Sequence, residues 1–378
     1  MAVMHRSKPI TGLHHADDYS SSLGVTKVRL RLITCSHPQS RSRQRYASAS
    51  RRPCGRRRGE TSPAPAPRMT LPHPSMNPEW CISAGGSHSD ELAAYGVLTA
   101  LTLLAAVIAL ATIQAQFSTP APYGRHEAGH AEAEAGKWGP PVSQRVAHVL
   151  SDFPPGVLVF TAVFLGWGFS VPYGQLRQGH SGAAVRWNWL LWALFVAHYV
   201  HRGLLHPLLI MRYSSRTVRI GIPLAGLFPN VLFCYINACW IATCVYPSNW
   251  GSHPAFIIGI VLFSLGFVLN KYADWQTSRL RKPGETAYKP PSGLVLALNI
   301  ANPNYLGELI EWIGYAIAAW SPPAIVWAAF GAATFVPRSK HNLQWIHKHF
   351  SGSQDSAKDA AAVKQPRLPR WALIPGVW

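Results

Sequence analysis

The sequence predicts an all-α polytopic membrane bundle of about seven transmembrane helices. Only 13% of its residues are charged, 48% are apolar, and 15 of the 378 are Trp. Low charge, clustered apolar runs and abundant Trp are typical of chains that cross a bilayer several times. The apolar runs also have the roughly 20-residue length that a helix needs to span the hydrocarbon core.

Residues 1–88 precede the first apolar segment and form a basic, low-complexity extension. Much of the formal net charge of +19 comes from residues 1–68, which are rich in Arg, Ser and Pro and lack an apolar period, as in a disordered chain. The extension could be an organellar transit peptide, a nucleic-acid-binding tail, or a translated leader ahead of a start at Met69 or Met76. We favour the leader, because an Arg-rich N-terminus would face the lumen in the topology derived next.

Seven apolar segments follow, near residues 92–115, 156–173, 186–205, 221–246, 254–272, 296–320 and 322–337. Basic residues occur in the loops after the first, third and fifth segments and in the tail after the seventh, at Lys137, Arg216, Lys282 and Lys340 among others. The loop YPSNWGSHP, between the fourth and fifth segments, has no Lys or Arg. The positive-inside rule therefore places the basic loops and the C-terminus in the cytosol.

The stretch from Asn270 to Trp320 carries many charged groups although it lies between two apolar segments. A charge at membrane depth costs about 2.5–3.5 kcal/mol on insertion scales, so such groups usually serve a function. Asn270 and Asp274 are four residues apart and share one face of a helix. The helix cannot continue past Lys282, because a proline follows it. We predict a polar pocket with a cationic mouth in this part of the bundle.

Two other patterns give no metal or phosphate motif. His198, His201 and His206 are close in sequence, but three histidines without a nearby carboxylate make a poor Zn or Fe site. The cysteines show no ligand spacing, so the sequence predicts neither a metal site nor a structural disulfide. GxxxxGK[ST] does not occur, so a bound nucleotide would have to be held by charged side chains on the cytosolic face.

Two strings, LRKPGETAYKPP (280–291) and NPNYLGELIEWIGYAIAAWS (302–321), closely resemble the C-terminal domain of the steroid 5α-reductases, including the plant-type sterol reductases. With weaker matches upstream, the resemblance covers residues 90–378. It implies a transmembrane reductase domain over residues 89–378, with a cofactor-binding half over residues 205–378, in the endoplasmic reticulum membrane. It also implies NADPH-dependent reduction of the 4,5 double bond of a 3-oxo-4-ene steroid or sterol to the 5α product.

The same resemblance implies roles for individual residues. Tyr199, in the string HYVHR, and Asp152 would be catalytic, with Tyr123 and Ser151 contacting the substrate. The family has a Gln–Glu pair where this chain has Ser151 and Asp152, so the carboxyl is one methylene shorter. The implied cofactor contacts are Arg202, Arg212, Asn270, Asp274, Arg281, Tyr288, Asn304, Glu308 and His341. Simpler structural roles are an interfacial anchor for Tyr199 and a helix N-cap for Asp152.

Saturating a carbon–carbon double bond conjugated to a ketone sends hydride to the β carbon and develops negative charge on the ketone oxygen. A tyrosine hydroxyl and a carboxyl kept protonated by burial can donate hydrogen bonds to that oxygen in a dry pocket. The hydride must come from a cofactor, because no side chain supplies one.

Three rival functions stay open at this point. The first is a trans-2-enoyl-CoA reductase of the same superfamily, and the second is a membrane methyltransferase that uses S-adenosylmethionine. The third is a non-enzymatic transporter-like or scaffold bundle. The predicted partners are the lipid bilayer and a steroid or sterol substrate, with no nucleic acid, and no oligomeric state is predicted.

Overall fold

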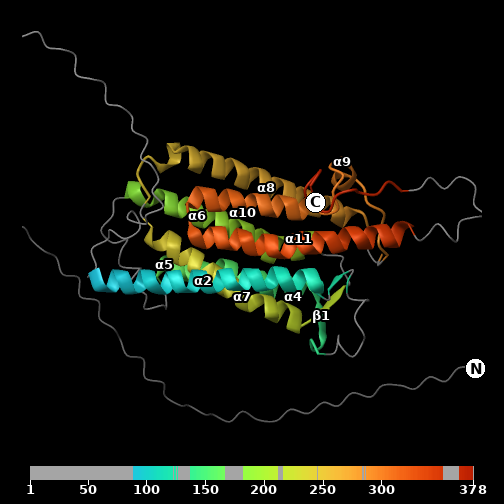
Figure 1. Ribbon diagram of the computed structural model, residues 1–378, viewed down its shortest axis with the longest axis horizontal. Helices are drawn as coiled ribbons and strands as arrows, with labels where there is room; N and C mark the ends of the chain where they lie inside the picture. The colour runs from blue at the N-terminus through green and yellow to red at the C-terminus, as the bar shows by residue number, and fades with distance from the viewer. Residues whose placement is uncertain are drawn as a thin grey trace, which may run out of the picture. The chain divides into compact units, whose positions relative to one another are not determined.

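Long helices lie side by side in the computed structural model, which describes residues 88–121, 123–124, 126, 137–166, 182–211, 216–244, 246–282, 285, 287–351 and 366–377 (Figure 1). These residues all belong to one compact unit, Leu71–Trp378. The predicted extension lies outside the described residues except for His88, where the first helix begins.

The architecture is all-α, as predicted. The α-helices are α2 (His88–Ser118), α4 (Gln144–Phe153), α5 (Phe160–Leu165), α6 (Gly182–Val200), α7 (Gly221–Thr243), α8 (Pro254–Arg279), α9 (Leu294–Ala297), α10 (Pro303–Ala319) and α11 (Pro322–Ser351). Two π-helices, η2 (Pro154–Val159) and η4 (His201–Ile210), and a 3₁₀ turn, η5 (Trp250–Ser252), complete the helical elements of the described residues. The strands β1 (Pro141–Ser143) and β2 (Thr217–Arg219) form one short antiparallel pair.

Four helical stretches are long and apolar enough to cross a membrane: Gly96–Ser118, Gln144–Leu165, Gly221–Thr243 and Pro254–Arg279. The α10 helix has 17 residues and buries two glutamates, Glu308 and Glu311, so it does not meet the same standard. The structure therefore supports a membrane bundle, and the number of seven spans stays a prediction.

Both π-helices occur where the sequence places proline near the site. Pro154 and Pro155 begin η2, and Pro207 lies inside η4. A π-helix leaves out some of the i→i−4 hydrogen bonds, so it tolerates residues that lack an N–H. The second apolar segment consequently begins at Gln144 instead of near residue 156, and it ends at Gly166, whose φ of 78° is left-handed. Asp152 therefore lies in the last turn of α4 and is not the N-cap of the next helix.

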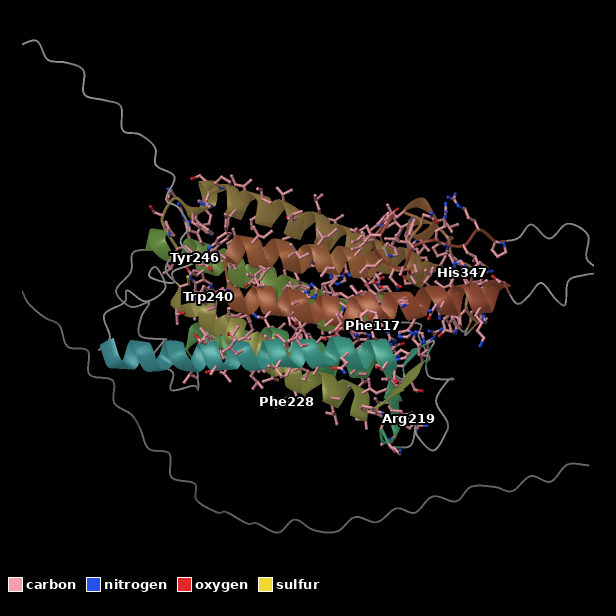
Figure 2. All side chains as sticks on the ribbon, viewed as in Figure 1. Phe117, Arg219, Phe228, Trp240, Tyr246 and His347 are labelled. Carbon is pink, nitrogen blue, oxygen red and sulfur yellow. The ribbon has the colours of Figure 1, made fainter. Side chains whose placement is uncertain are left out.

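The loops that the charge pattern groups together meet at one end of the bundle. The β1–β2 pair joins the loop after α2 to the loop after η4. The Tyr288 ring, in the loop after α8, lies 4.4 Å from the guanidinium of Arg216 and 4.6 Å from the Trp345 ring of α11, between centroids. Figure 2 labels side chains at this end (Arg219, His347) and at the opposite end (Trp240, Tyr246).

The α8 and α10 helices approach each other almost backbone to backbone. A Cβ on Gly266 of α8 would meet the Glu311 amide nitrogen, and a Cβ on Gly307 of α10 would lie 2.5 Å from the Asn270 nitrogen. Small residues at such a crossing allow close van der Waals contact, which drives helix association where water is absent. The crossing places the polar residues of α8 directly against those of α10.

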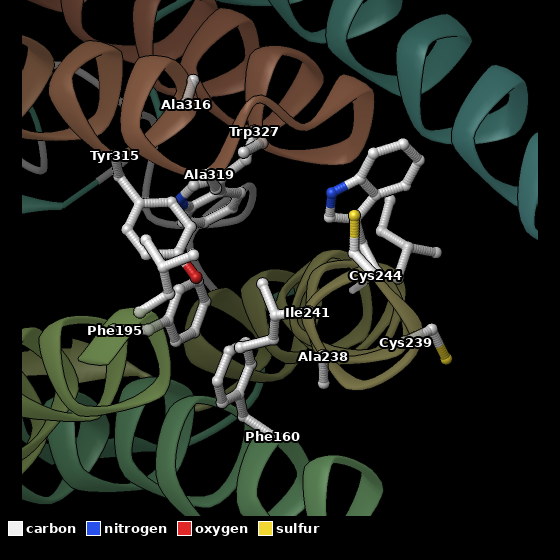
Figure 3. Close-up of a cluster of buried hydrophobic side chains, with 14 of the residues drawn as sticks. Phe160, Phe195, Ala238, Cys239, Ile241, Cys244, Tyr315, Ala316, Ala319 and Trp327 are labelled. Carbon is white, nitrogen blue, oxygen red and sulfur yellow. The ribbon is translucent and has the colours of Figure 1, made fainter. Parts of the chain in front are cut away.

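Apolar and aromatic side chains from several helices fill the core, and Figure 3 shows part of this cluster. Phe160 of α5 stacks on Phe195 of α6 with centroids 3.8 Å apart, and Tyr315 of α10 lies 5.5 Å from the Phe195 ring. Cys234 and Cys239 of α7 are buried and free, whereas Cys244 is disulfide-bonded. The expectation that no cysteine forms a disulfide is therefore wrong at Cys244, because a disulfide depends on how close two cysteines lie in the fold, which spacing along the chain does not reveal.

Candidate active site

An ion-paired network lies where α4, η4 and α10 meet, with Arg202 at its centre. The Arg202 Nη1 is 2.9 Å from Glu308 Oε2, and its Nε is 3.4 Å from Asp152 Oδ2. The side chains of Asp152 and Glu308 are only 8% and 6% exposed. One guanidinium thus neutralises two buried carboxylates from different helices. A buried carboxylate without such a partner would strongly destabilise the fold.

Glu308 and its neighbour one turn later also hold a buried histidine. His198 of α6 places Nδ1 2.7 Å from Glu311 Oε1 and Nε2 3.8 Å from Glu308 Oε1. The His198 ring lies against Trp312, with centroids 4.5 Å apart. Glu311 Oε2 has no hydrogen-bond partner among the described residues. The histidine therefore links the acidic face of α10 to α6 inside the bundle.

The predicted polar face of α8 meets the N-terminal turn of α10. Asn270 Nδ2 donates to the backbone oxygen of Asn304 at 2.9 Å, and Asn304 Nδ2 donates to Asp274 Oδ1 at 3.0 Å. Lys271 Nζ donates to Asn270 Oδ1 at 2.8 Å. Asp274 Oδ2 is also 3.7 Å from His206 Nδ1 of η4. The spacing argument for Asn270 and Asp274 is thus confirmed, because both side chains reach the same residue of α10.

Tyr199 lies beside this network and is almost fully buried, with 1% of the residue exposed. A Cβ on Gly156 of η2 would fall inside the Tyr199 ring, so the ring rests directly on the glycine. Gly156 follows Asp152 by four residues, and Arg202 follows Tyr199 by three, so both pairs sit about one turn apart along the same contact between the two helices.

One oxygen of the Asp152 carboxyl carries two polar contacts. His148 Nδ1 lies 3.3 Å from Oδ2, the same atom that Arg202 contacts. Burial alone was expected to keep Asp152 protonated. The structure instead pairs the carboxyl with a guanidinium, which favours the charged form, so a proton must come from a neighbour.

Tyr123 is anchored to α11. The Arg338 guanidinium lies 3.5 Å from the Tyr123 ring centroid, and its Nη2 donates to the Tyr123 carbonyl at 3.1 Å. Burial raises the pKa of Tyr123, which keeps the hydroxyl protonated and able to donate. His126, three residues later, also contacts α11, since its Nε2 is 2.9 Å from Asn342 Oδ1. The loop after α2 is therefore held on the same end of the bundle as the network.

Three further predicted residues, Ser151, His341 and Arg212, make no contact with the Arg202 network that the structure describes. The Ser151 hydroxyl donates to the His148 carbonyl one turn earlier on α4, at 3.5 Å. His341 Nε2 lies 3.2 Å from the Gln116 carbonyl, at the end of α2, and not in the network. Arg212 lies outside the described residues.

A second cationic and aromatic cluster surrounds Tyr288 at the loop end of the bundle. The Arg216 and Arg281 guanidinium groups lie 4.4 Å and 5.7 Å from its ring centroid. Burial, followed by the charge of Arg216, lowers the pKa of Arg281. Trp345 and His349 of α11 stack at 4.3 Å beside the same ring. Two arginines around aromatic faces suit phosphate and purine groups, so this cluster fits the polar end of a dinucleotide.

The residues of the site that sequence reasoning missed include His148, Lys271 and Arg338. Each had a signal. Lys271 is a charge inside an apolar run, His148 is one helical turn before Asp152, and Arg338 is a charge that directly follows an apolar segment. Among the described residues, no group of three or more His, Cys, Asp or Glu is arranged to hold a metal ion.

Comparisons with known proteins find matches over most of this region. A family profile described as 3-oxo-5-alpha-steroid 4-dehydrogenase matches residues 220–359, which contain α7, α8, α10 and α11. The 3-oxo-5-alpha-steroid 4-dehydrogenase 1 of Rattus norvegicus is 32% identical over 275 residues, which are 71% of this chain and 95% of that protein. The 3-oxo-5-alpha-steroid 4-dehydrogenase 2 of Sus scrofa is 31% identical over 259 residues, 67% of this chain and 92% of that protein.

Proposed function

Because the chain belongs to the 3-oxo-5-alpha-steroid 4-dehydrogenase family and is an oxidoreductase, we propose that it uses NADPH to reduce the 4,5 double bond of a 3-oxo-4-ene steroid or sterol. The product would carry hydrogen at the 5α position. The single observation that carries the proposal is the contact between η2 and α6, where the buried Tyr199 ring lies directly on Gly156, four residues after Asp152.

In this mechanism Tyr199 and Asp152 act on the ketone. The Tyr199 hydroxyl donates a hydrogen bond to the ketone oxygen as negative charge develops there. Asp152, once a neighbouring group has protonated it, donates a second hydrogen bond to the same oxygen, while Arg202 holds its Oδ2. Solvent exclusion strengthens these interactions, since both side chains are buried among helices. Tyr123 closes the site from the loop after α2.

The nicotinamide, when bound, supplies the hydride. We propose that Asn270, Asn304, Asp274 and Glu308 orient its polar groups. Two buried nitrogens in this region, His201 Nδ1 and His206 Nδ1, make no hydrogen bond in the described structure, as expected for a site that binds a polar ligand. Arg216 and Arg281, on either side of Tyr288, would hold the phosphates at the basic end.

We place the enzyme in the endoplasmic reticulum membrane with its C-terminus in the cytosol, where NADPH is present. Support comes from the basic loops that meet around Tyr288, because positive residues favour the cytosolic side. The cofactor would then enter from the cytosol, and the steroid from the bilayer.

Membranes that contain the full chain, supplied with NADPH and progesterone or campest-4-en-3-one, test the proposal. Mass spectrometry should detect a product two hydrogens heavier, and stereospecifically deuterated NADPH should place deuterium at C5. Turnover of a trans-2-enoyl-CoA without turnover of either steroid would assign the rival reductase activity instead. A transfer of methyl from S-adenosylmethionine without reduction would exclude both reductases.

The cofactor assignment has its own test. Arg281→Gln should raise the KM for NADPH by roughly 10-fold or more and leave the KM for NADH nearly unchanged, because a lost charge-assisted hydrogen bond to phosphate costs about 1.5–3 kcal/mol. Arg279→Gln is the matched control, since Arg279 contacts the Trp275 ring at 4.4 Å and not Tyr288. Equal effects on NADPH and NADH would contradict a phosphate contact.

A further inference from the structure

His148 occupies a position between the solvent-accessible end of the bundle and Asp152. It lies one helical turn before Asp152 on α4, and its Nδ1 is 3.3 Å from Asp152 Oδ2. The His148 side chain is 28% exposed, whereas the Asp152 side chain is 8% exposed. A partly exposed titratable group is therefore hydrogen-bonded to a buried carboxyl.

The groups around His148 come from three elements. On α4 they are Asp152 and Arg145, on η4 they are Arg202 and His206, and on α8 the nearest acid is Asp274. The rings of His148 and His206 meet edge to face with centroids 5.8 Å apart. Asp274 pairs with His206 and not with His148. The carboxyl that His148 contacts directly is thus that of Asp152.

The proposed reaction consumes one proton for each hydride. Arg202 cannot provide it, because a guanidinium does not deprotonate in proteins. The Tyr199 hydroxyl can donate a hydrogen bond but would have to recover any proton that it gave up. Histidine is the side chain whose charge ordinarily changes between pH 5 and 8, so it can both hold a proton and release it at neutral pH.

We propose that His148 is the proton relay of this site, acting through Asp152; this rests on the proposed function. The hydride adds to the β carbon of the enone, and the π electron pair moves onto the ketone oxygen. The Nδ1 proton of a cationic His148 passes to the charged Asp152 carboxylate, and Asp152 gives a proton to that oxygen and forms the enol. Asp152 is then again a carboxylate, and a proton from solvent restores the cation of His148. The enol then becomes the ketone in exchange with solvent.

The relay explains how the site works with aspartate in place of a longer carboxyl. Arg202 fixes Oδ2, so the carboxyl cannot turn to solvent for a new proton. His148 approaches that same oxygen from the exposed side. The i, i+4 spacing on α4 holds donor and acceptor together without a conformational change.

The test compares His148→Gln and His148→Ala in membranes with the full chain. Both variants should lower kcat by roughly 10²-fold, the lower end of the usual range for general acid–base groups, with little change in the KM for steroid or NADPH. Imidazole added to His148→Ala should restore at least part of the rate, because the exposed site admits a small base. The pH dependence of kcat between pH 5 and 8 should weaken in His148→Gln. His253→Gln, at the N-cap of α8, is the histidine control.

The outcomes separate the relay from the reaction itself. A wild-type enzyme that reduces the steroid, with a fully active His148→Gln variant, would overturn the relay and leave the proposed function intact. A slow His148→Ala variant that imidazole does not rescue, with an unchanged pH profile, would also overturn it, since that result indicates a structural role. A wild-type enzyme inactive on every 3-oxo-4-ene steroid would overturn the proposed function, and the relay with it.

Discussion

Two helix contacts build this site, and they use glycine differently. Where α8 crosses α10, Gly266 and Gly307 bring two backbones together, so a methyl group there would meet main-chain atoms of the other helix. Where η2 crosses α6, Gly156 brings a backbone against one side chain, the Tyr199 ring. The first contact sets the distance between helices, and the second sets the position of one hydroxyl. We therefore expect changes at the first to reduce folding and changes at the second to reduce catalysis.

The largest expected effect is at the α8–α10 crossing. Gly266→Ala should lower the free energy of unfolding by about 3 kcal/mol, at the upper end of overpacking costs, because neither backbone can move away without separating the helices. The melting temperature of the detergent-solubilised protein measures this. Gly226→Ala on α7, where a Cβ would meet nothing within 4 Å, should be neutral or slightly stabilising. Equal melting temperatures for the two variants would refute the backbone-contact argument.

Tyr199→Phe should reduce catalysis and leave the fold intact. Loss of one donor to a developing oxyanion ordinarily costs about 10²–10³-fold in kcat. Tyr315→Phe is the matched control, since Tyr315 is equally buried and its hydroxyl has no hydrogen-bond partner in the described structure. Its loss should leave kcat unchanged and stability unchanged or improved. Similar kcat values for the two variants would contradict the role given to Tyr199.

Gly156→Ala should have an intermediate effect. The added methyl group displaces a side-chain ring and no backbone, so the melting temperature should fall less than in Gly266→Ala. A Cβ there would lie 1.9 Å from the Tyr199 ring, so the ring and its hydroxyl must move by more than about 1 Å. A misplacement of that size should lower kcat by roughly 10²-fold. Steady-state kinetics with a melting curve on the same preparation measure both quantities. A large loss of stability with normal kcat would contradict the view that the Gly156 contact serves catalysis more than folding.

The smallest effect is expected in the loop after α8, at the basic end of the bundle. Glu285 accepts from the Lys282 amide at 2.9 Å and from Lys289 at 2.9 Å, and these bonds lower the pKa of the Glu285 carboxyl. The hydrogen bond from the Lys282 amide to the Glu285 carboxylate is therefore fully present at neutral pH. It is lost as the pH falls through a value below about 4.3, the ordinary pKa of Glu.

Hydrogen exchange at the Lys282 amide checks this. Glu285→Gln should raise the exchange rate a few-fold at neutral pH, because the neutral amide is a weaker acceptor. Protection in the wild type, relative to this variant, should disappear in acid. Identical exchange in the two proteins at pH 7 would show that the carboxylate does not order the loop.

Much of the site could be anticipated from local patterns in the sequence. Residues four apart lie on one face of a helix, so Asn270 and Asp274 were predicted together, and both contact Asn304. The family strings supplied Tyr199 and Glu308. The prediction that Asp152 could be a helix N-cap was wrong. A π-helical turn accommodates Pro154 inside a continuous helix, and composition does not predict such a turn.

The sequence by itself determined the helical class, the apolar segments and the faces that carry polar groups, because these depend on residues within one or two turns. Only the tertiary structure decided that Arg202 bridges Asp152 and Glu308, that Arg338 lies on Tyr123, and that Gly156 supports Tyr199. Each of these contacts joins helices far apart in the chain. Their partners are chosen by helix spacing and by the need to pair every buried charge, and neither of these can be deduced from a single segment.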